Sequence, residues 1–153
     1  MKTKTLIILS IVWVTHTACN ADMDLGFLKD IPSVEGYQSL KLTDVEWKLI
    51  GFVDAKQDDI RMIESGSGKY FTLLFNDNNT LSGWSSSNEL VGSYKISSKS
   101  SITIGIMAFT KVGEVCDGKL YIEYLNNVKT FSMTEKGLAL YYDKNKFLLF
   151  KPI

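Results

Sequence analysis

Histidine is nearly absent from this 153-residue chain, where it occurs once, as His16. That residue lies in a segment that we expect to be removed as a leader, so the rest of the chain has no imidazole. The absence excludes the Ser-His-Asp and Cys-His arrangements of nucleophilic catalysis and the usual zinc sites. Acid–base chemistry near neutral pH would fall to a carboxylate, lysine or tyrosine with a shifted pKa. We therefore expect no catalytic residue, no metal ligand and no cofactor.

An excess of basic residues is also lacking. The chain carries 17 basic and 17 acidic residues. Removing residues 1–18 takes away Lys2 and Lys4 and leaves a net charge of about −2. Nucleic-acid binding depends on clustered lysine and arginine that neutralise phosphates, and the sequence has no such cluster. We therefore expect no nucleic-acid partner.

The first eighteen residues have the layout of an export signal. Two lysines precede an apolar run at residues 6–14, and small residues come directly before Cys19. A charged start, a short apolar middle and a small residue at the cut are typical of such a leader. Its end resembles the lipobox of bacterial lipoproteins, although His16 stands where leucine is usual. The resemblance implies lipidation of Cys19 and removal of residues 1–18.

Alternatives to a lipid anchor stay open. An uncleaved anchor needs ~20 apolar residues to span a bilayer, and the run at residues 6–14 is much shorter. An ordinary secretory signal is the other alternative. With Cys19 lipidated, Cys116 is left as a small buried core residue or as a reactive thiol beside an activating base or cation. Without lipidation, a Cys19–Cys116 disulfide is the competing prediction.

Residues 19–40 are polar, with thinly spread apolar side chains, which is typical of a spacer between an anchor and a domain. Asn20 suits sorting to the outer membrane, and Asp22 and Asp24 resemble surface-export tags, although a solvated linker explains them equally well. We expect contact with the membrane through the N-terminal lipid of a Gram-negative bacterium, on the periplasmic face or the cell surface. The expected boundaries are 1–18 for the leader, 19–40 for the tether and 41–153 for one domain.

That domain has the pattern of a mainly β protein with one helix. Apolar residues recur at helical spacing after Asp117, which predicts a helix over residues 117–126 with Asp117 as its cap. Many short strands with regular turns predict a barrel or a sandwich, and the late helix would be a lid or plug. The expected strands are residues 47–53, 60–63, 70–75, 80–84, 90–96, 101–107, 129–133, 138–142 and 147–150.

A set of residues in this pattern resembles the META domain of heat-shock-inducible bacterial lipoproteins. The likeness covers residues 42–150. It rests on an aromatic strand at residues 71–75 followed by Ser82, Gly83, Asn88, Gly92, Tyr94 and Cys116. Ser87 stands where the family carries a cysteine, which removes the family's possible cysteine pairing. The resemblance implies a small antiparallel β-barrel with one inserted helix and an envelope role linked to stress or antibiotic tolerance. It implies no catalytic residues.

Three aromatic residues are candidate ligand contacts. Trp84 ends a strand at a serine-rich loop, where an indole can stack on a sugar or fill a partner's pocket. Tyr121 and Tyr124 lie on the expected helix. Packing in the core or at its rim is the alternative for all three.

Other polar and glycine positions have a structural alternative that we favour. Asn88 would satisfy backbone groups of its loop, and Tyr94 would pack inward with a bonded hydroxyl. Glycines at 51, 83, 92 and 105 would mark bulges and bends.

Three functions follow from these observations. The first is a non-enzymatic, META-like, stress-related lipoprotein that binds an envelope protein or a small ligand. The second is a surface glycan-binding accessory built on Trp84. The third is an enzyme that uses the carboxylates of Asp58, Asp59 and Glu64. A packed barrel interior would leave only the outer loops as candidate sites.

Overall fold

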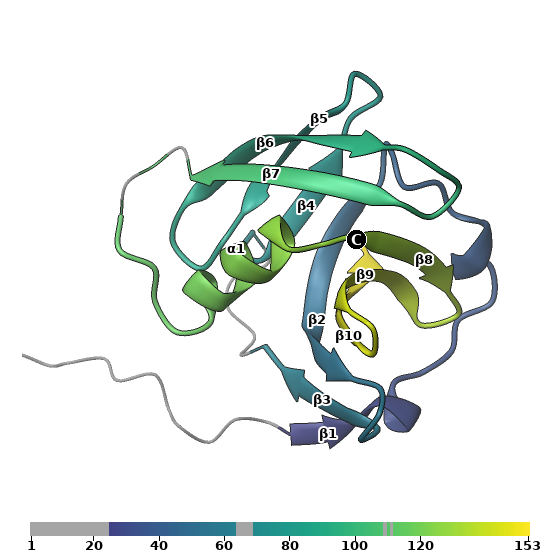
Figure 1. Cartoon of the computed structure of the whole chain (residues 1–153). Coiled ribbons are helices and arrows are strands. Elements are labelled where there is room, and N and C mark those ends of the chain that lie inside the picture. Colours follow the sequence, from purple (N-terminus) through teal and green to yellow (C-terminus); the bar gives the residue numbers. More distant parts are fainter. Residues whose placement is uncertain (1–24, 64–68, 109, 111) are drawn as a thin grey trace, which may run out of the picture.

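The computed structural model describes residues 25–63, 69–108, 110 and 112–153. It confirms the expected fold class, because a curled antiparallel sheet wraps around one α-helix in these residues to form a small, partly open barrel (Figure 1). The predicted leader and Cys19 lie outside the described residues. Within the described part of the chain, no helix has the length and apolar character that a bilayer crossing needs.

The described residues form ten strands, one α-helix and two 3-10 helices. The strands are β1 (Leu25–Phe27), β2 (Glu46–Asp54), β3 (Asp59–Met62), β4 (Thr72–Phe75), β5 (Thr80–Trp84), β6 (Glu89–Ile96), β7 (Ile102–Ala108), β8 (Thr130–Thr134), β9 (Gly137–Asp143) and β10 (Lys146–Pro152). Helix α1 spans Gly118–Asn126, and two short 3-10 helices, η1 (Leu28–Asp30) and η2 (Tyr37–Ser39), precede β2.

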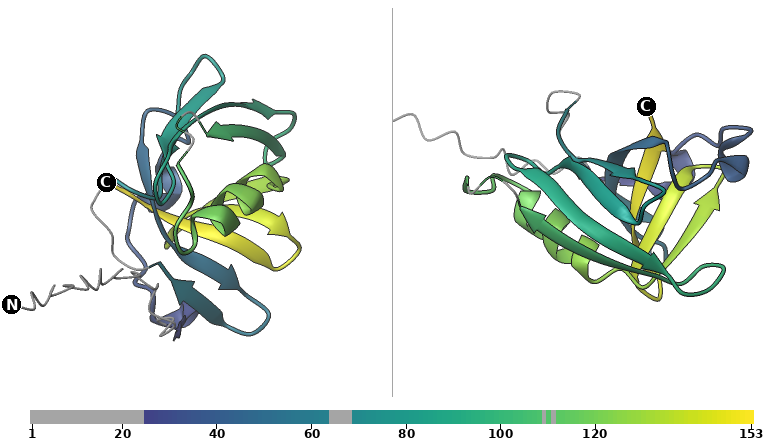
Figure 2. Two further views of the ribbon diagram at one scale, coloured as in Figure 1. Left: turned by 90° about the vertical axis from the view of Figure 1, so that its left-hand side faces the viewer. Right: turned by 90° about the horizontal axis from the view of Figure 1, so that it is seen from above.

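The sheet runs in the order β7-β6-β5-β4-β2-β10-β9-β8, with β3 on β2 and β1 on β3. Its two ends meet at a bridge between Ser101 and Thr130, beside a hydrogen bond from the Ile102 N–H to the Lys129 carbonyl. Helix α1 follows β7 and lies on the concave side of the sheet (Figures 1 and 2). The side-chain oxygen of Asn126 accepts the N–H of Ile106 at 2.8 Å, which satisfies part of the β7 edge.

Two expected details were wrong, each for a local reason. The strand predicted from residue 70 begins at Thr72, because Phe71 adopts a left-handed φ of 54° that interrupts extended backbone. Asp117 precedes helix α1, but its side chain makes no capping bond. Its carboxylate instead lies 2.6 Å from the Arg61 guanidinium on β3.

The expected tether is also wrong for its described part. Residues 25–27 form β1, which pairs with β3, and the backbone then runs along the outside of the barrel to β2 (Figure 1). Leu28 and Ile31 pack against an apolar cluster of Val53, Ile60, Ala139, Phe147 and Leu149. This cluster covers the outer face of β2, β9 and β10. The folded unit therefore includes residues well before position 41.

The barrel interior is packed. Trp47, Phe75, Tyr121 and Phe150 are among its fully buried side chains, and helix α1 inserts Tyr121 and Leu125 as a plug. Strand β2 contributes alternate side chains to the inner and the outer cluster, and a bulge shifts the inward positions from Trp47 and Leu49 to Phe52. Gly51 pairs with Leu149 and Leu49 with Phe150, which leaves Ile50 without a partner in that ladder. Gly51 thus marks a bulge, as expected.

Candidate functional site

The predicted ligand contact at Tyr121 is a core residue. Its side chain is 0% exposed, and its ring meets Phe71 edge-on at 5.4 Å. The hydroxyl donates to the Thr72 carbonyl at 3.3 Å, and burial raises the pKa of Tyr121 well above its usual value. A ligand outside the barrel does not reach this side chain.

Tyr124 belongs to a half-buried aromatic cluster at the rim of the barrel. Its ring stacks on Tyr142 with centroids 4.2 Å apart and meets Phe52 edge-on at 5.6 Å. The guanidinium of Arg61 lies 4.6 Å from the Phe52 ring centroid and pairs with Asp117. The cluster ties helix α1 to β2, β3 and β9, and this is a packing role.

Trp84 lies at the loop edge, as predicted, and is partly exposed. Tyr70 meets its ring edge-on at 6.4 Å, and the Lys69 ammonium lies 3.8 Å from the ring centroid. A cation over an indole face is attracted by the ring electrons. That ammonium lies over one face of the indole, so a sugar that stacks on this face would have to displace it.

The META-like residues have structural roles in this fold. Tyr94 is buried, and its hydroxyl donates to the Asn76 carbonyl at 2.8 Å. Burial, followed by Asp77 and Asp44, raises the pKa of Tyr94. A Cβ at Gly83 would lie 2.0 Å from the Thr72 carbonyl oxygen, and one at Gly92 would lie 2.1 Å from that of Gly105. Ser82 pairs with Leu74 and Val91 inside the sheet.

Asn88 is the centre of a buried polar network. Its side-chain oxygen accepts the Val112 N–H at 2.9 Å and the Thr110 hydroxyl at 3.0 Å. Its amide group donates to the Val112 carbonyl at 2.8 Å and to the Glu114 carboxylate. The favoured prediction for Asn88 is thus confirmed, because it satisfies loop backbone groups.

Glu114 also belongs to this network, and it lies in the segment just before helix α1. Its two carboxylate oxygens accept the hydroxyls of Ser85 at 2.7 Å and Ser86 at 2.6 Å. Gly118 is needed beside them, because a Cβ there would lie 2.1 Å from both Glu114 Oε2 and Ser86 Oγ. The network fixes where the helix begins.

Cys116 is exposed and disulfide-bonded. It is therefore neither the buried core residue nor the reactive thiol that we expected beside a lipidated Cys19. The other cysteine of the chain is Cys19, which lies outside the described residues. Lipidation of Cys19 stays a prediction, and the Cys19–Cys116 disulfide stays its alternative. The two exclude each other, because each uses the Cys19 sulfur, and a disulfide-bonded Cys116 counts in favour of the alternative.

The three candidate carboxylates do not form a described site. Asp58 accepts the Lys29 N–H at 3.1 Å and lies 3.9 Å from its ammonium. Asp59 lies on β3 in register with Phe27, and Glu64 is outside the described residues. Across the described residues, no group of three or more histidine, cysteine, aspartate and glutamate side chains is arranged so that it could hold a metal ion.

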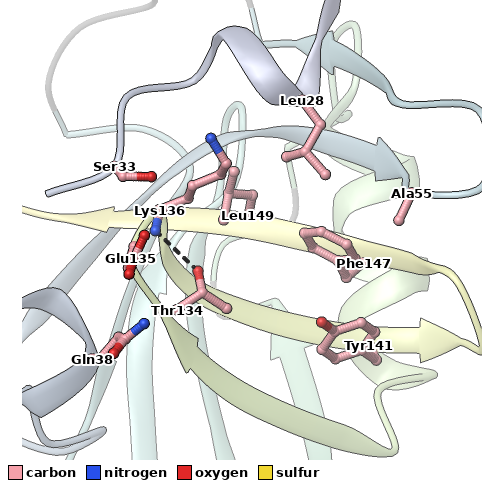
Figure 3. A pocket seen from close by; sticks show the side chains of 10 residues that line it. All are labelled: Leu28, Ser33, Gln38, Ala55, Thr134, Glu135, Lys136, Tyr141, Phe147 and Leu149. Carbon is pink, nitrogen blue, oxygen red and sulfur yellow. Dashed lines mark hydrogen bonds between the residues drawn. The ribbon is translucent and has the colours of Figure 1, made fainter.

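A groove on the outer face of the barrel is the best candidate site (Figure 3). One wall is residues 28–34, which we call the strap. Backbone hydrogen bonds tie both ends of the strap. The Leu28 N–H donates to the Asp58 carbonyl at 2.9 Å, and the Val34 N–H donates to the Glu135 carbonyl at 2.7 Å. Between these ends the ammonium of Lys136 donates to the Ile31 carbonyl.

The groove has a volume of about 400 Å³, within the usual range of small-ligand sites. Its floor is apolar, and its rim carries a few polar groups. The lining residues are Leu28, Ser33, Gln38, Ala55, Thr134, Glu135, Lys136, Tyr141, Phe147 and Leu149. The rings of Tyr141 and Phe147 lie against each other with centroids 4.8 Å apart, and burial raises the pKa of Tyr141.

The turn between β8 and β9 places Lys136 over the groove. The Thr134 hydroxyl donates to the Gly137 carbonyl at 2.9 Å and accepts the Lys136 N–H at 3.1 Å. Gly137 has a φ of 125°, which a residue with a side chain rarely adopts. The two bonds of Thr134 hold the backbone at the base of the Lys136 side chain in place.

Sequence reasoning missed this groove because it treated the strap as a solvated linker. The signal was the pair Leu28 and Ile31, two apolar residues three positions apart in a polar segment. Such spacing indicates a short apolar face. Nothing in the sequence indicated that this face packs on β9 and β10.

Two solved structures share the fold. One is the NMR structure of a protein from Burkholderia xenovorans, with a TM-score of 0.57 and 19% identity over 73% of this chain and 83% of that chain. The other is a crystal structure of a DUF4847 family protein from Bacteroides vulgatus, with a TM-score of 0.54 and 14% identity over 71% of this chain and 92% of that one. No family model and no curated protein match the chain. At these identities the likeness shows the fold alone.

Proposed function

We propose that this protein is a non-enzymatic, lipid-anchored envelope protein that binds a small ligand in the strap groove. The observation that carries the proposal is the groove itself, an outer hollow of about 400 Å³ with an apolar floor and a polar rim. The barrel interior is filled by side chains and by helix α1, so a ligand site belongs on the outside.

The anchor and the location are part of the proposal. The charged, short apolar leader before Cys19 supports export and lipidation, with the outer membrane as the destination. Membership of the META family and a role in stress are likewise proposals. They are supported by the order of strands and helix and by the structural roles of Asn88, Gly83 and Tyr94.

Blocking the groove tests the ligand site. The full chain, carried in lipid nanodiscs, is analysed by native mass spectrometry for small molecules retained from the envelope. Ala55 and Ser33 line the groove, so the double change Ala55→Trp and Ser33→Trp fills it. We expect this variant to lose the retained molecule, while Lys95→Trp on the exposed face of β6 keeps it. Equal retention in both variants would falsify the proposed site.

A further inference from the structure

The polarity of the strap groove changes along its length. Leu28, Ala55 and Phe147 lie at one end, and Ser33, Gln38 and Lys136 lie toward the other, with Leu149 on the floor between them (Figure 3). An elongated hollow with one apolar and one hydrogen-bonding end complements a molecule that has an apolar tail and a polar head. A groove whose two ends were both polar or both apolar would not favour such a molecule.

Lys136 sets the charge that the polar end prefers. An ammonium group has three N–H donors, and among the described contacts Lys136 uses its ammonium for one bond, to the Ile31 carbonyl. That acceptor is neutral, and none of the ion pairs between described residues includes Lys136. Two donors and one positive charge are thus available to an anionic group, for which charge-assisted hydrogen bonds are strong.

Glu135 opposes this preference from the same rim. Its side chain is exposed, whereas Lys136 is half-buried and held to the strap. Water screens an exposed charge more than a partly buried one. The net preference of the polar end is therefore for an anion, and it is weakened by Glu135.

We propose that the groove binds a single-chain aliphatic amphiphile with an anionic head, for which a carboxylate is the simplest example. This inference rests on the proposed function and names the ligand class. The tail lies over Phe147 and Leu149, and the head accepts hydrogen bonds from Lys136 Nζ. The strap covers the bound chain, so residues 28–34 contribute one wall of the site.

Three probes with the same tail and different heads test the ligand class: octanoate, octanol and octylammonium. Each is titrated calorimetrically into the full chain in nanodiscs, with empty nanodiscs as the baseline for partitioning into lipid. We expect affinity in the order octanoate, octanol, octylammonium. The groove-filled double variant at Ala55 and Ser33 should bind none of them above the baseline.

Charge variants then locate the head group. Lys136→Gln should weaken octanoate by about tenfold and leave octanol unchanged, whereas Lys136→Arg keeps the preference for octanoate. Glu135→Gln should tighten octanoate, because it removes the opposing charge. Lys95→Gln, on the exposed face of β6, is the matched control and should change nothing.

The two proposals fail in different ways. If octylammonium binds as tightly as octanoate, or Lys136→Gln leaves octanoate unchanged, the inferred ligand class is wrong. The groove then stands as a site only if the molecule retained from the envelope still depends on it. If neither the probes nor any retained molecule responds to the groove-filled variant, both the ligand class and the proposed function are wrong.

Discussion

The backbone N–H of Val34 donates to the carbonyl oxygen of Glu135 at 2.7 Å, which joins the end of the strap to the turn between β8 and β9. These residues are 101 positions apart in the chain. The bond brings the strap next to the turn that carries Lys136. This bond and the one from the Lys136 ammonium to the Ile31 carbonyl thus hold the two sides of the candidate site together.

Removing that contact should loosen the strap and leave the barrel intact. Val34→Pro removes the donor, because proline has no backbone N–H. We expect hydrogen exchange at the Leu28 and Ile31 amides to become about fivefold faster, since a typical hydrogen bond contributes about 1 kcal/mol. Val34→Ala keeps the N–H and should exchange like the parent. Unchanged exchange in the proline variant would show that the strap is held by packing alone.

Two glycines in the sheet should differ sharply in their tolerance of alanine. At Gly83 a Cβ would lie 2.0 Å from the Thr72 carbonyl oxygen, whereas at Gly105 nothing lies within 4 Å. Gly83→Ala should lower the free energy of unfolding by about 1–3 kcal/mol. Gly105→Ala should stay within about 0.5 kcal/mol of the parent. Urea unfolding measures both, and equal effects would contradict the close strand approach at Gly83.

Asn88→Ala should destabilise the start of helix α1. The change leaves the Val112 backbone and the Glu114 carboxylate without bonds that Asn88 now supplies. A buried polar group without a partner costs about 1–3 kcal/mol. Asn145→Ala, in an exposed turn, is the control and should stay within about 0.5 kcal/mol. Chemical unfolding compares the two, and similar losses would mean that the network contributes little.

Alkaline pH should destabilise the fold partly through Tyr142. Burial, followed by Tyr124 and Asp54, raises the pKa of Tyr142 to about 12. The unfolded chain releases this proton near a pKa of about 10. The folded form therefore holds the proton more tightly, and its stabilising effect is complete below pH ~10 and is lost as the pH rises toward 12.

Tyr142→Phe cannot titrate, so its unfolding free energy should fall less steeply over this pH range. Phenolate absorbance should show one fewer late-titrating tyrosine in the variant than in the parent, where the pKa values of Tyr94, Tyr121 and Tyr141 are also raised. Equal slopes for parent and variant would contradict the raised pKa.

Mass spectrometry of the protein from envelope membranes tests the anchor. We expect an N-terminal peptide that begins at Cys19 and carries acyl chains. Cys19→Ser should be released from membranes because it loses several apolar chains at roughly 0.8 kcal/mol per buried methylene. A peptide that joins Cys19 to Cys116 by a disulfide would instead support the alternative and remove the lipid anchor.

The sequence was sufficient for the elements whose pattern is local. Alternation with a period of two in residues 138–142 predicts a strand, and β9 contains it. The spacing of Leu120, Tyr121, Tyr124 and Leu125 predicts the helix to within one residue. These patterns depend only on residues that are close in the sequence, so they can be recognised before the fold is known.

The candidate site depends instead on contacts between distant residues. Leu28 packs on the outer apolar cluster, and Asn88 meets Glu114, only after the sheet has curled. The left-handed φ of Phe71 is similar, because tertiary packing against Tyr121 selects it against the preference of an aromatic residue. Local propensity carries no information on such choices.

The path of the strap also decides how the molecule would respond to a mechanical load. A pull applied ahead of Leu25 acts first on the three-residue pairing of β1 with β3 and then on the wall above Phe147. The strands of the barrel come later along the chain, so they bear the force last. Tension would thus empty the groove at forces that leave the hydrophobic interior untouched.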